Sequence, residues 1–206
     1  MKWAVLVGGT GSNLRAILVS GISVALVVSH RAGVKALSVA EEFQVPTRVV
    51  LPGEYPDKAS YDVALCQLFS QHGIESVAMA GFLRWLGPDM INRYPGHIVN
   101  LHPSLLPAYP GLHAIERAFK DRVRWSGVTM HFVDEGHDTG PIIAQSPVPL
   151  LARDSLEEFS DRMHLVEHRL YPQVLKALDG GRLRLEKGHV IYEGEDQEWM
   201  HGHSLA

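Results

Sequence analysis

The sequence predicts an α/β fold with a doubly wound, mostly parallel sheet that carries helices on both faces. Short apolar runs of strand length, such as residues 3–7 and 76–80, alternate with segments of helical periodicity. Strands separated by helices of this length pair in parallel through right-handed crossovers and bind ligands at their carboxyl ends. With 206 residues, of which 46% are hydrophobic, the chain is expected to form a single domain over residues 1–206.

The N-terminal half predicts three successive strand–helix steps and a fourth strand. The first apolar run ends in glycines, and the segment after them has helical character. Tyr61, Leu65, Leu68 and Phe69 recur at helical spacing within the third helix. We therefore expect strands at residues 3–7, 22–29, 47–51 and 76–80, and helices at residues 14–19, 34–43 and 57–72.

The C-terminal half begins with a strand that ends at His102, where a proline-rich loop excludes helix. A long helix is expected to start at Asp154 or Ser155 and to stop near Gly180. The remaining expected elements are a helix at residues 114–120, strands at 125–133 and 142–149, the long helix at 156–178, a small C-terminal β-hairpin from 183–185 and 190–192, and a polar, flexible tail at 194–206.

Composition excludes several classes of protein. The net charge of -4 argues against a partner bound through phosphate backbones, so no nucleic acid is expected. Cys66 is the only cysteine, which rules out an intrachain disulfide and fits a reducing compartment. The first apolar run is too short for a signal peptide, and the longest, residues 22–28, cannot span a bilayer. We expect a cytoplasmic protein with no membrane contact.

The glycine-rich loop at residues 8–13 joins the first strand to the first helix. Backbone N–H groups at such a helix start bind anions, and Ser12 and Asn13 can cap the helix or add donors. Leu14 stands where a dinucleotide-binding loop needs its third glycine, and the lysine of a P-loop is absent. The loop therefore predicts a monophosphate site, and a turn without a ligand is the alternative.

Polar side chains at other strand ends predict chemistry there. Asn100 and His102 alternate along one strand, so an amide donor and a titratable ring point the same way. The tight acidic turn that contains Asp138 can direct a carboxylate at this edge, although a solvated turn residue is the alternative. The apolar loop around Arg84 suits a flat aromatic ligand with an acidic tail, or else packs under a helix.

Metal and nucleophilic chemistry are not expected. The sequence lacks a metalloprotease motif, and His164 and His168, one helical turn apart, have no evident third ligand. Cys66 lies in a predicted helix, and Ser104 lacks the strand-to-helix turn of a nucleophilic serine.

Motifs along nearly the whole chain resemble those of the folate-dependent formyltransferases. They are Gly9-Thr10-Gly11-Ser12-Asn13-Leu14, Ala80-Gly81-Phe82, Asn100-Leu101-His102-Pro103-Ser104-Leu105-Leu106-Pro107, Tyr109-Pro110-Gly111, His131-Phe132-Val133, Asp138-Thr139-Gly140-Pro141 and Glu167-His168. The resemblance implies a Rossmann-like sheet and transfer of a formyl group from 10-formyltetrahydrofolate, the co-substrate, to a primary amine. The motifs are most similar to those of members that formylate glycinamide ribonucleotide in purine biosynthesis.

The resemblance also implies roles for individual residues, with small molecules as the only partners and a monomer or homodimer as the assembly. The implied catalytic residues are Asn100, His102 and Asp138; the phosphate and ribose contacts are Gly11, Ser12, Asn13, Lys58 and Glu167; the folate contacts are Arg84, Trp85, Leu86, Val133, Asp134, Glu135, Gly136 and His137. No metal is implied.

Four positions depart from the family's pattern. Gly8 replaces a serine, His30 an asparagine, Lys58 an arginine and His137 an aliphatic residue. Because the catalytic trio is intact, these departures concern affinity and pH response more than reaction type. Two alternatives stay open: a formyltetrahydrofolate hydrolase-like member, whose extra N-terminal domain this chain is expected to lack, and a catalytically silent phosphosugar-binding protein.

Overall fold

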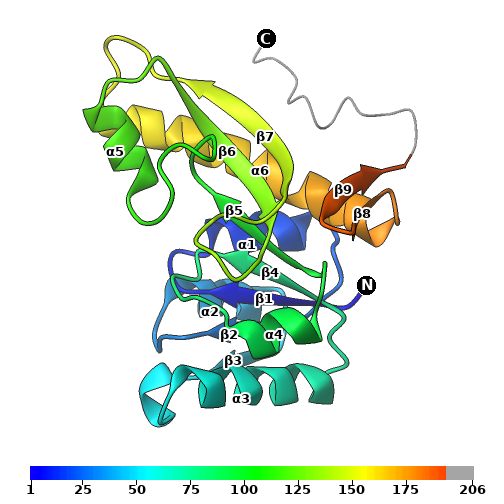
Figure 1. Cartoon of the computed structure of the whole chain (residues 1–206). Helices are drawn as coiled ribbons and strands as arrows, with labels where there is room; N and C mark the ends of the chain where they lie inside the picture. Colours follow the sequence, from blue (N-terminus) through cyan, green and yellow to red (C-terminus); the bar gives the residue numbers. More distant parts are fainter. Residues whose placement is uncertain (194–206) are drawn as a thin grey trace. The chain divides into compact units, whose positions relative to one another are not determined.

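The computed structural model describes residues 1–193 (Figure 1). The chain divides into two compact units, Met1–Asn100 and Leu101–Ala206. The single domain over residues 1–206 stays a prediction, and the expected flexible tail, 194–206, lies outside the described residues.

Seven strands form one mixed, mostly parallel sheet in the order β3-β2-β1-β4-β5-β6-β7. Neighbours from β3 to β5 pair in parallel, whereas β6 and β7 are antiparallel. The predicted fold class is therefore confirmed. The strands are β1 (Trp3–Val7), β2 (Val24–Ser29), β3 (Thr47–Val49), β4 (Ser76–Ala80), β5 (Ile98–His102), β6 (Trp125–Phe132) and β7 (Ile142–Pro149).

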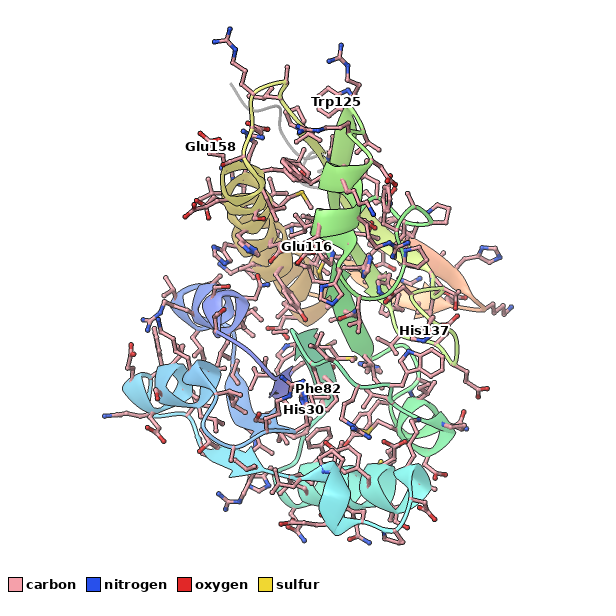
Figure 2. All side chains as sticks on the ribbon, turned by 90° about the vertical axis from the view of Figure 1, so that its left-hand side faces the viewer. His30, Phe82, Glu116, Trp125, His137 and Glu158 are labelled. Carbon is pink, nitrogen blue, oxygen red and sulfur yellow. The ribbon has the colours of Figure 1, made fainter. Side chains whose placement is uncertain are left out.

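The first unit is doubly wound around β1 and β4, both of which are buried throughout. The strand order reverses between these two strands, so right-handed crossovers put α1 and α2 on one face of the sheet and α3 and α4 on the other (Figure 2). Open sheets of this kind bind ligands at such a reversal point. The helices are α1 (Ser12–Val19), α2 (Lys35–Glu42), the short 3-10 helix η1 (Pro52–Glu54), α3 (Lys58–Gln71) and α4 (Pro88–Arg93).

Sequence periodicity did not predict α4. Its six residues are too few to display a helical pattern, although Pro88 occupies the first helical position after the N-cap Gly87.

The second unit packs the long helix α6 (Leu156–Asp179) against β6 and β7 (Figure 1). Ser155 and Glu158 form a capping box, which confirms Ser155 as the start signal. Helix α5 (Ala114–Lys120) contacts α6 through Phe119 and Phe159.

The predicted C-terminal hairpin is present as the antiparallel strands β8 (Leu183–Glu186) and β9 (His189–Tyr192). Lys187 and Gly188 both adopt positive φ angles at its turn, as a type I′ hairpin turn requires. The Tyr192 hydroxyl donates to the Ile143 carbonyl and ties the hairpin to β7. Within residues 1–193, no helix combines the length and apolarity needed to cross a membrane.

Candidate active site

His102 ends strand β5 and is only 5% exposed. Its Nδ1 atom lies 3.4 Å from Oδ2 of Asp138, and its Nε2 atom lies 2.8 Å from the carbonyl oxygen of Tyr109. Because both ring nitrogens face acceptor oxygens, the ring is held in one orientation. Asn100 lies two residues earlier on the same strand.

Asp138 is held by a backbone hydrogen bond to one carboxylate oxygen and has a buried histidine beside the other. The Gly111 N–H donates to Oδ2 at 2.8 Å, and Nε2 of His131 lies 3.7 Å from Oδ1. Asp138 itself has a φ of 52°, in the left-handed region that few non-glycine residues adopt. The backbone and its neighbours thus direct this carboxylate toward His102, as expected of the acidic turn.

A buried hydrogen-bond network anchors the proline-rich loop that supplies Tyr109. Thr129 on β6 donates to the Ser104 carbonyl at 2.6 Å and accepts from the Leu106 N–H at 3.1 Å. Gln145 on β7 donates to Thr129 Oγ1 and to the Leu106 carbonyl, at 2.9 and 2.8 Å. The side chains of Thr129 and Gln145 therefore attach the loop to the two antiparallel strands. The spacing of residues in the sequence does not predict this role.

His131 was not among the predicted site residues, yet it is a neighbour of Asp138. It is buried, and its Nδ1 lies 2.8 Å from the Phe132 carbonyl, which fixes it as the donor nitrogen. Burial lowers the pKa of His131, and the Phe132 carbonyl and the Asp138 carboxylate oppose this shift. The ring is thus neutral near pH 7. The motif His131-Phe132-Val133 was the only sequence signal.

Acidification is expected to destabilise the protein through His131. Because its folded pKa lies below the ordinary value of 6.5, its stabilising contribution is complete above that pH and is lost as the pH falls. His131→Asn keeps a donor for the Phe132 carbonyl but cannot titrate. Between pH 7.5 and 5.5, wild type should lose more unfolding free energy than the variant. Urea unfolding measures the difference, and equal losses would contradict the assignment.

The predicted folate loop at residues 133–137 is a tight turn. The Asp134 carboxylate accepts from the Gly136 N–H at 3.0 Å and from the Thr139 hydroxyl at 2.9 Å, so it serves the turn itself. A Cβ on Gly136 would lie 1.9 Å from Thr139 Oγ1, so a side chain there would displace the hydroxyl that donates to Asp134. Glu135 and His137 are both exposed. Figure 2 shows His137 on this loop.

Glu167 on α6 is buried. A carboxylate is rarely buried unless other groups pair with its charge. His164 Nδ1 lies 3.2 Å from Glu167 Oε2, and this hydrogen bond raises the pKa of His164. His164 and His168 stack one helical turn apart. Among residues 1–193, no group of three or more histidine, cysteine or acidic side chains is arranged to hold a metal ion.

In the first unit, the glycine loop requires Gly11. Its φ is 82°, and a Cβ there would lie 2.6 Å from the Ala36 Cα. The expectation that Ser12 or Asn13 caps the helix is wrong: α1 starts at Ser12, and its N-cap is Gly11, which has no side chain with which to cap. Ser12 and Asn13 lie instead in the first turn, where N–H groups lack intrahelical acceptors.

Lys58, the first residue of α3, lies beside Asp62, whose side chain is 1% exposed. Lys58 Nζ is 3.4 Å from Asp62 Oδ2, and the same oxygen accepts the Gly87 N–H at 2.6 Å. Burial raises the pKa of Asp62, and Lys58 opposes this shift. Asp62 therefore ties the start of α4 to α3. A single acid among the apolar residues of α3 was the available sequence signal.

Lys58→Ala is expected to raise the KM for a phosphate-bearing substrate by less than about tenfold, since an exposed lysine contributes about 1 kcal/mol or less. The same change leaves buried Asp62 without its cation and should lower the melting temperature. Lys58→Met, which keeps the apolar stem, separates packing from charge. Steady-state kinetics and thermal unfolding test both effects, and a KM rise beyond about a hundredfold would instead make Lys58 a principal phosphate ligand.

The loop around Arg84 presents apolar surface. Leu83 and Trp85 are 56% and 48% exposed, whereas Phe82 and Leu86 are buried and anchor the loop. The Arg84 guanidinium lies over the Tyr61 ring, 5.7 Å from its centroid. Exposed apolar side chains flanking a cation are suited to a flat ligand with an acidic tail.

Comparison with known proteins identifies the family. The family model described as formyl transferase matches residues 1–175. The chain belongs to the formyl transferase family. Among relatives of this formyl transferase, the phosphoribosylglycinamide formyltransferase of Bacillus subtilis is 41% identical over 90% of the chain and 98% of the relative. The trifunctional purine biosynthetic protein adenosine-3 of Homo sapiens is 36% identical over 94% of the chain, which spans 20% of that longer protein.

Solved structures agree with this formyl transferase fold. The crystal structure of glycinamide ribonucleotide transformylase 1 from Symbiobacterium toebii matches with a TM-score of 0.90 and 38% identity, over 94% of each chain. The phosphoribosylglycinamide formyltransferase of Streptococcus pneumoniae matches with a TM-score of 0.84 and 42% identity, over 86% of this chain and 98% of the other. The resemblance inferred from the motifs is therefore confirmed.

Proposed function

We propose that this protein transfers the formyl group of 10-formyltetrahydrofolate to the primary amine of glycinamide ribonucleotide in purine biosynthesis. The observation that carries the proposal is the buried His102 at the end of β5, with the Asp138 carboxylate 3.4 Å from its ring. The relatives named for this activity, aligned over nearly the whole chain, support it. Small molecules are then the only partners required, and we propose that the enzyme works in the cytoplasm as a single domain.

The reaction needs donors for a developing oxyanion. The amine lone pair attacks the formyl carbon, the carbonyl oxygen becomes an oxyanion, and the bond from that carbon to N10 of the folate then breaks. The attacking nitrogen loses a proton and N10 gains one. We assign Asn100 and His102 as oxyanion donors, each contributing about 3 kcal/mol when preorganised. For His102 this requires that its Nε2–H leave the Tyr109 carbonyl, 2.8 Å away, and turn to the oxyanion. Asp138 orients His102 and stabilises its charged form, or relays the proton through water.

The substrates are assigned to the loops described above. The N–H groups around Gly11, Ser12 and Asn13 suit the phosphate of the ribonucleotide, since they start helix α1. Lys58 adds an outer phosphate contact, and Glu167 accepts the ribose hydroxyls. The loop of Arg84, Trp85 and Leu86 and the turn at residues 133–137 bind the folate, with Arg84 attracting its glutamate tail.

A turnover assay with purified protein, glycinamide ribonucleotide and 10-formyltetrahydrofolate tests the proposal. We expect formylated ribonucleotide and tetrahydrofolate in equal amounts by mass spectrometry. Tetrahydrofolate released without the ribonucleotide would favour the hydrolase alternative. Binding of the ribonucleotide without any turnover would favour a silent phosphosugar-binding protein. His102→Ala serves as the matched control that separates enzymatic from spontaneous transfer.

A further inference from the structure

The His30 ring packs against the backbone of Gly8 so closely that residue 8 has no room for a side chain. Gly8 directly follows β1, and His30 directly follows the neighbouring strand β2. The two strands pair in parallel, with Val7 opposite Ser29. A Cβ on Gly8 would lie 2.3 Å from His30 Cε1 and 2.9 Å from the Gly81 carbonyl oxygen. Distances this short do not occur between real Cβ atoms and their neighbours. His30 can therefore occupy its place only because residue 8 has no side chain.

The His30 ring contacts the first residues of two loops. It meets Phe82 edge-on, with ring centroids 4.7 Å apart and planes at 86° (Figure 2). Both rings are buried, and Phe82 opens the loop that contains Arg84. His30 Cε1 also lies 2.3 Å from where a Cβ of Gly8 would be, at the first residue of the glycine loop. The ring thus contacts both loops, beside the reversal point of the sheet.

Both nitrogens of the imidazole are buried, which favours a role through the shape of the ring over direct contact with a ligand. Burial is the main cause that lowers the pKa of His30, and the cations Arg31 and Arg84 lower it further, whereas the Val7 carbonyl raises it. The ring is consequently neutral near pH 7, as packing against Phe82 favours.

We propose that His30 is a positioning residue that sets the spacing between the glycine loop and the Arg84 loop, and that Gly8 is its required partner. The proposal rests on the proposed function, in which the first loop binds the ribonucleotide phosphate and the second binds the folate.

A double-mutant cycle over Gly8→Ser and His30→Asn tests this pairing. Gly8→Ser alone should raise the KM for both substrates by at least about tenfold, because the new Cβ displaces His30 and both loops, while kcat at saturation changes less than about threefold. His30→Asn alone leaves a void beside Phe82 and should raise both KM values by a smaller factor. The double variant should bring both KM values well below those of Gly8→Ser, because the 2.3 Å clash with His30 is relieved and only the 2.9 Å approach to the Gly81 carbonyl oxygen remains.

The control is Gly53→Ser, since a Cβ at Gly53 meets no atom within 4 Å and should change neither KM. Thermal unfolding of each variant shows whether a KM change merely follows lost stability. If Gly8→Ser does not fold, rescue of folding and of both KM values in the double variant still supports the pairing. Multiplication of the two single effects in the double variant would overturn it, as would an unchanged KM in Gly8→Ser. Failure of the proposed function would appear separately, as absence of turnover in wild type.

Discussion

Asp138→Asn is expected to lower kcat at least about a hundredfold, with ribonucleotide affinity and thermal stability nearly unchanged. The asparagine retains an acceptor oxygen for the Gly111 N–H, so the turn keeps its hydrogen bond. It removes the negative charge that lies 3.4 Å from the His102 ring. That charge matters most when the ring stabilises an oxyanion, which explains a loss in kcat and not in binding.

Combining Asp138→Asn with His102→Ala should cost far less than the product of the two single losses, because groups that act as one unit cannot each be lost twice. Pre-steady-state kinetics and calorimetric binding of the ribonucleotide measure the two effects. The matched control is Glu116→Gln, which removes an exposed negative charge from the second compact half of the chain, outside the site (Figure 2). Fully multiplicative losses, or an Asp138→Asn protein that does not fold, would show that the two residues do not form one catalytic unit.

Gly11→Val should raise the KM for the ribonucleotide by at least about a hundredfold while the KM for the folate changes far less. A valine at a φ of 82° is strained, and its Cβ would be 2.6 Å from the backbone of Ala36, which cannot move aside without shifting α2. The start of α1 must therefore change position, and with it the N–H groups assigned to the phosphate.

The matched control for this change is Gly21→Val. Gly21 has the same φ of 82°, but a Cβ at this position would meet no atom within 4 Å, so the control isolates backbone strain from displacement of the loop. Steady-state kinetics with each substrate varied in turn gives both KM values. Equal increases for the two substrates in Gly11→Val would mean that the loop has a structural role and does not recognise the phosphate.

The order of strands and helices could be predicted because each element carries its own periodicity. Continuous apolar runs such as residues 3–7 and 76–80 became buried strands, and the capping box at Ser155 marked its helix. The short helix α4 was missed because six residues display no period. The strand predicted over residues 125–133 ends one residue earlier, at Phe132, beside an irregularity in its pairing with β7.

The site was predictable only where a motif or a strand end marked it. His102 and the turn at Asp138 carried such signals, and their roles remain predictions. Asp62 and His131 carried almost no such signal. Their importance depends on contacts with Gly87 and Asp138, residues that no regular spacing connects to them. Residue spacing does not encode contacts of this kind, so side-chain anchors are the part of a site that sequence reasoning recovers least well.

The proline-rich loop beside His102 also has a consequence for conformational entropy. Pro103, Pro107 and Pro110 restrict the unfolded chain at three positions, so ordering the loop removes less freedom than an equally long loop without prolines would lose. The bonds from Thr129 and Gln145 then fix the loop in the folded protein. A substrate that binds beside such a loop need not order it, and more of its binding free energy is available to hold the reacting groups together.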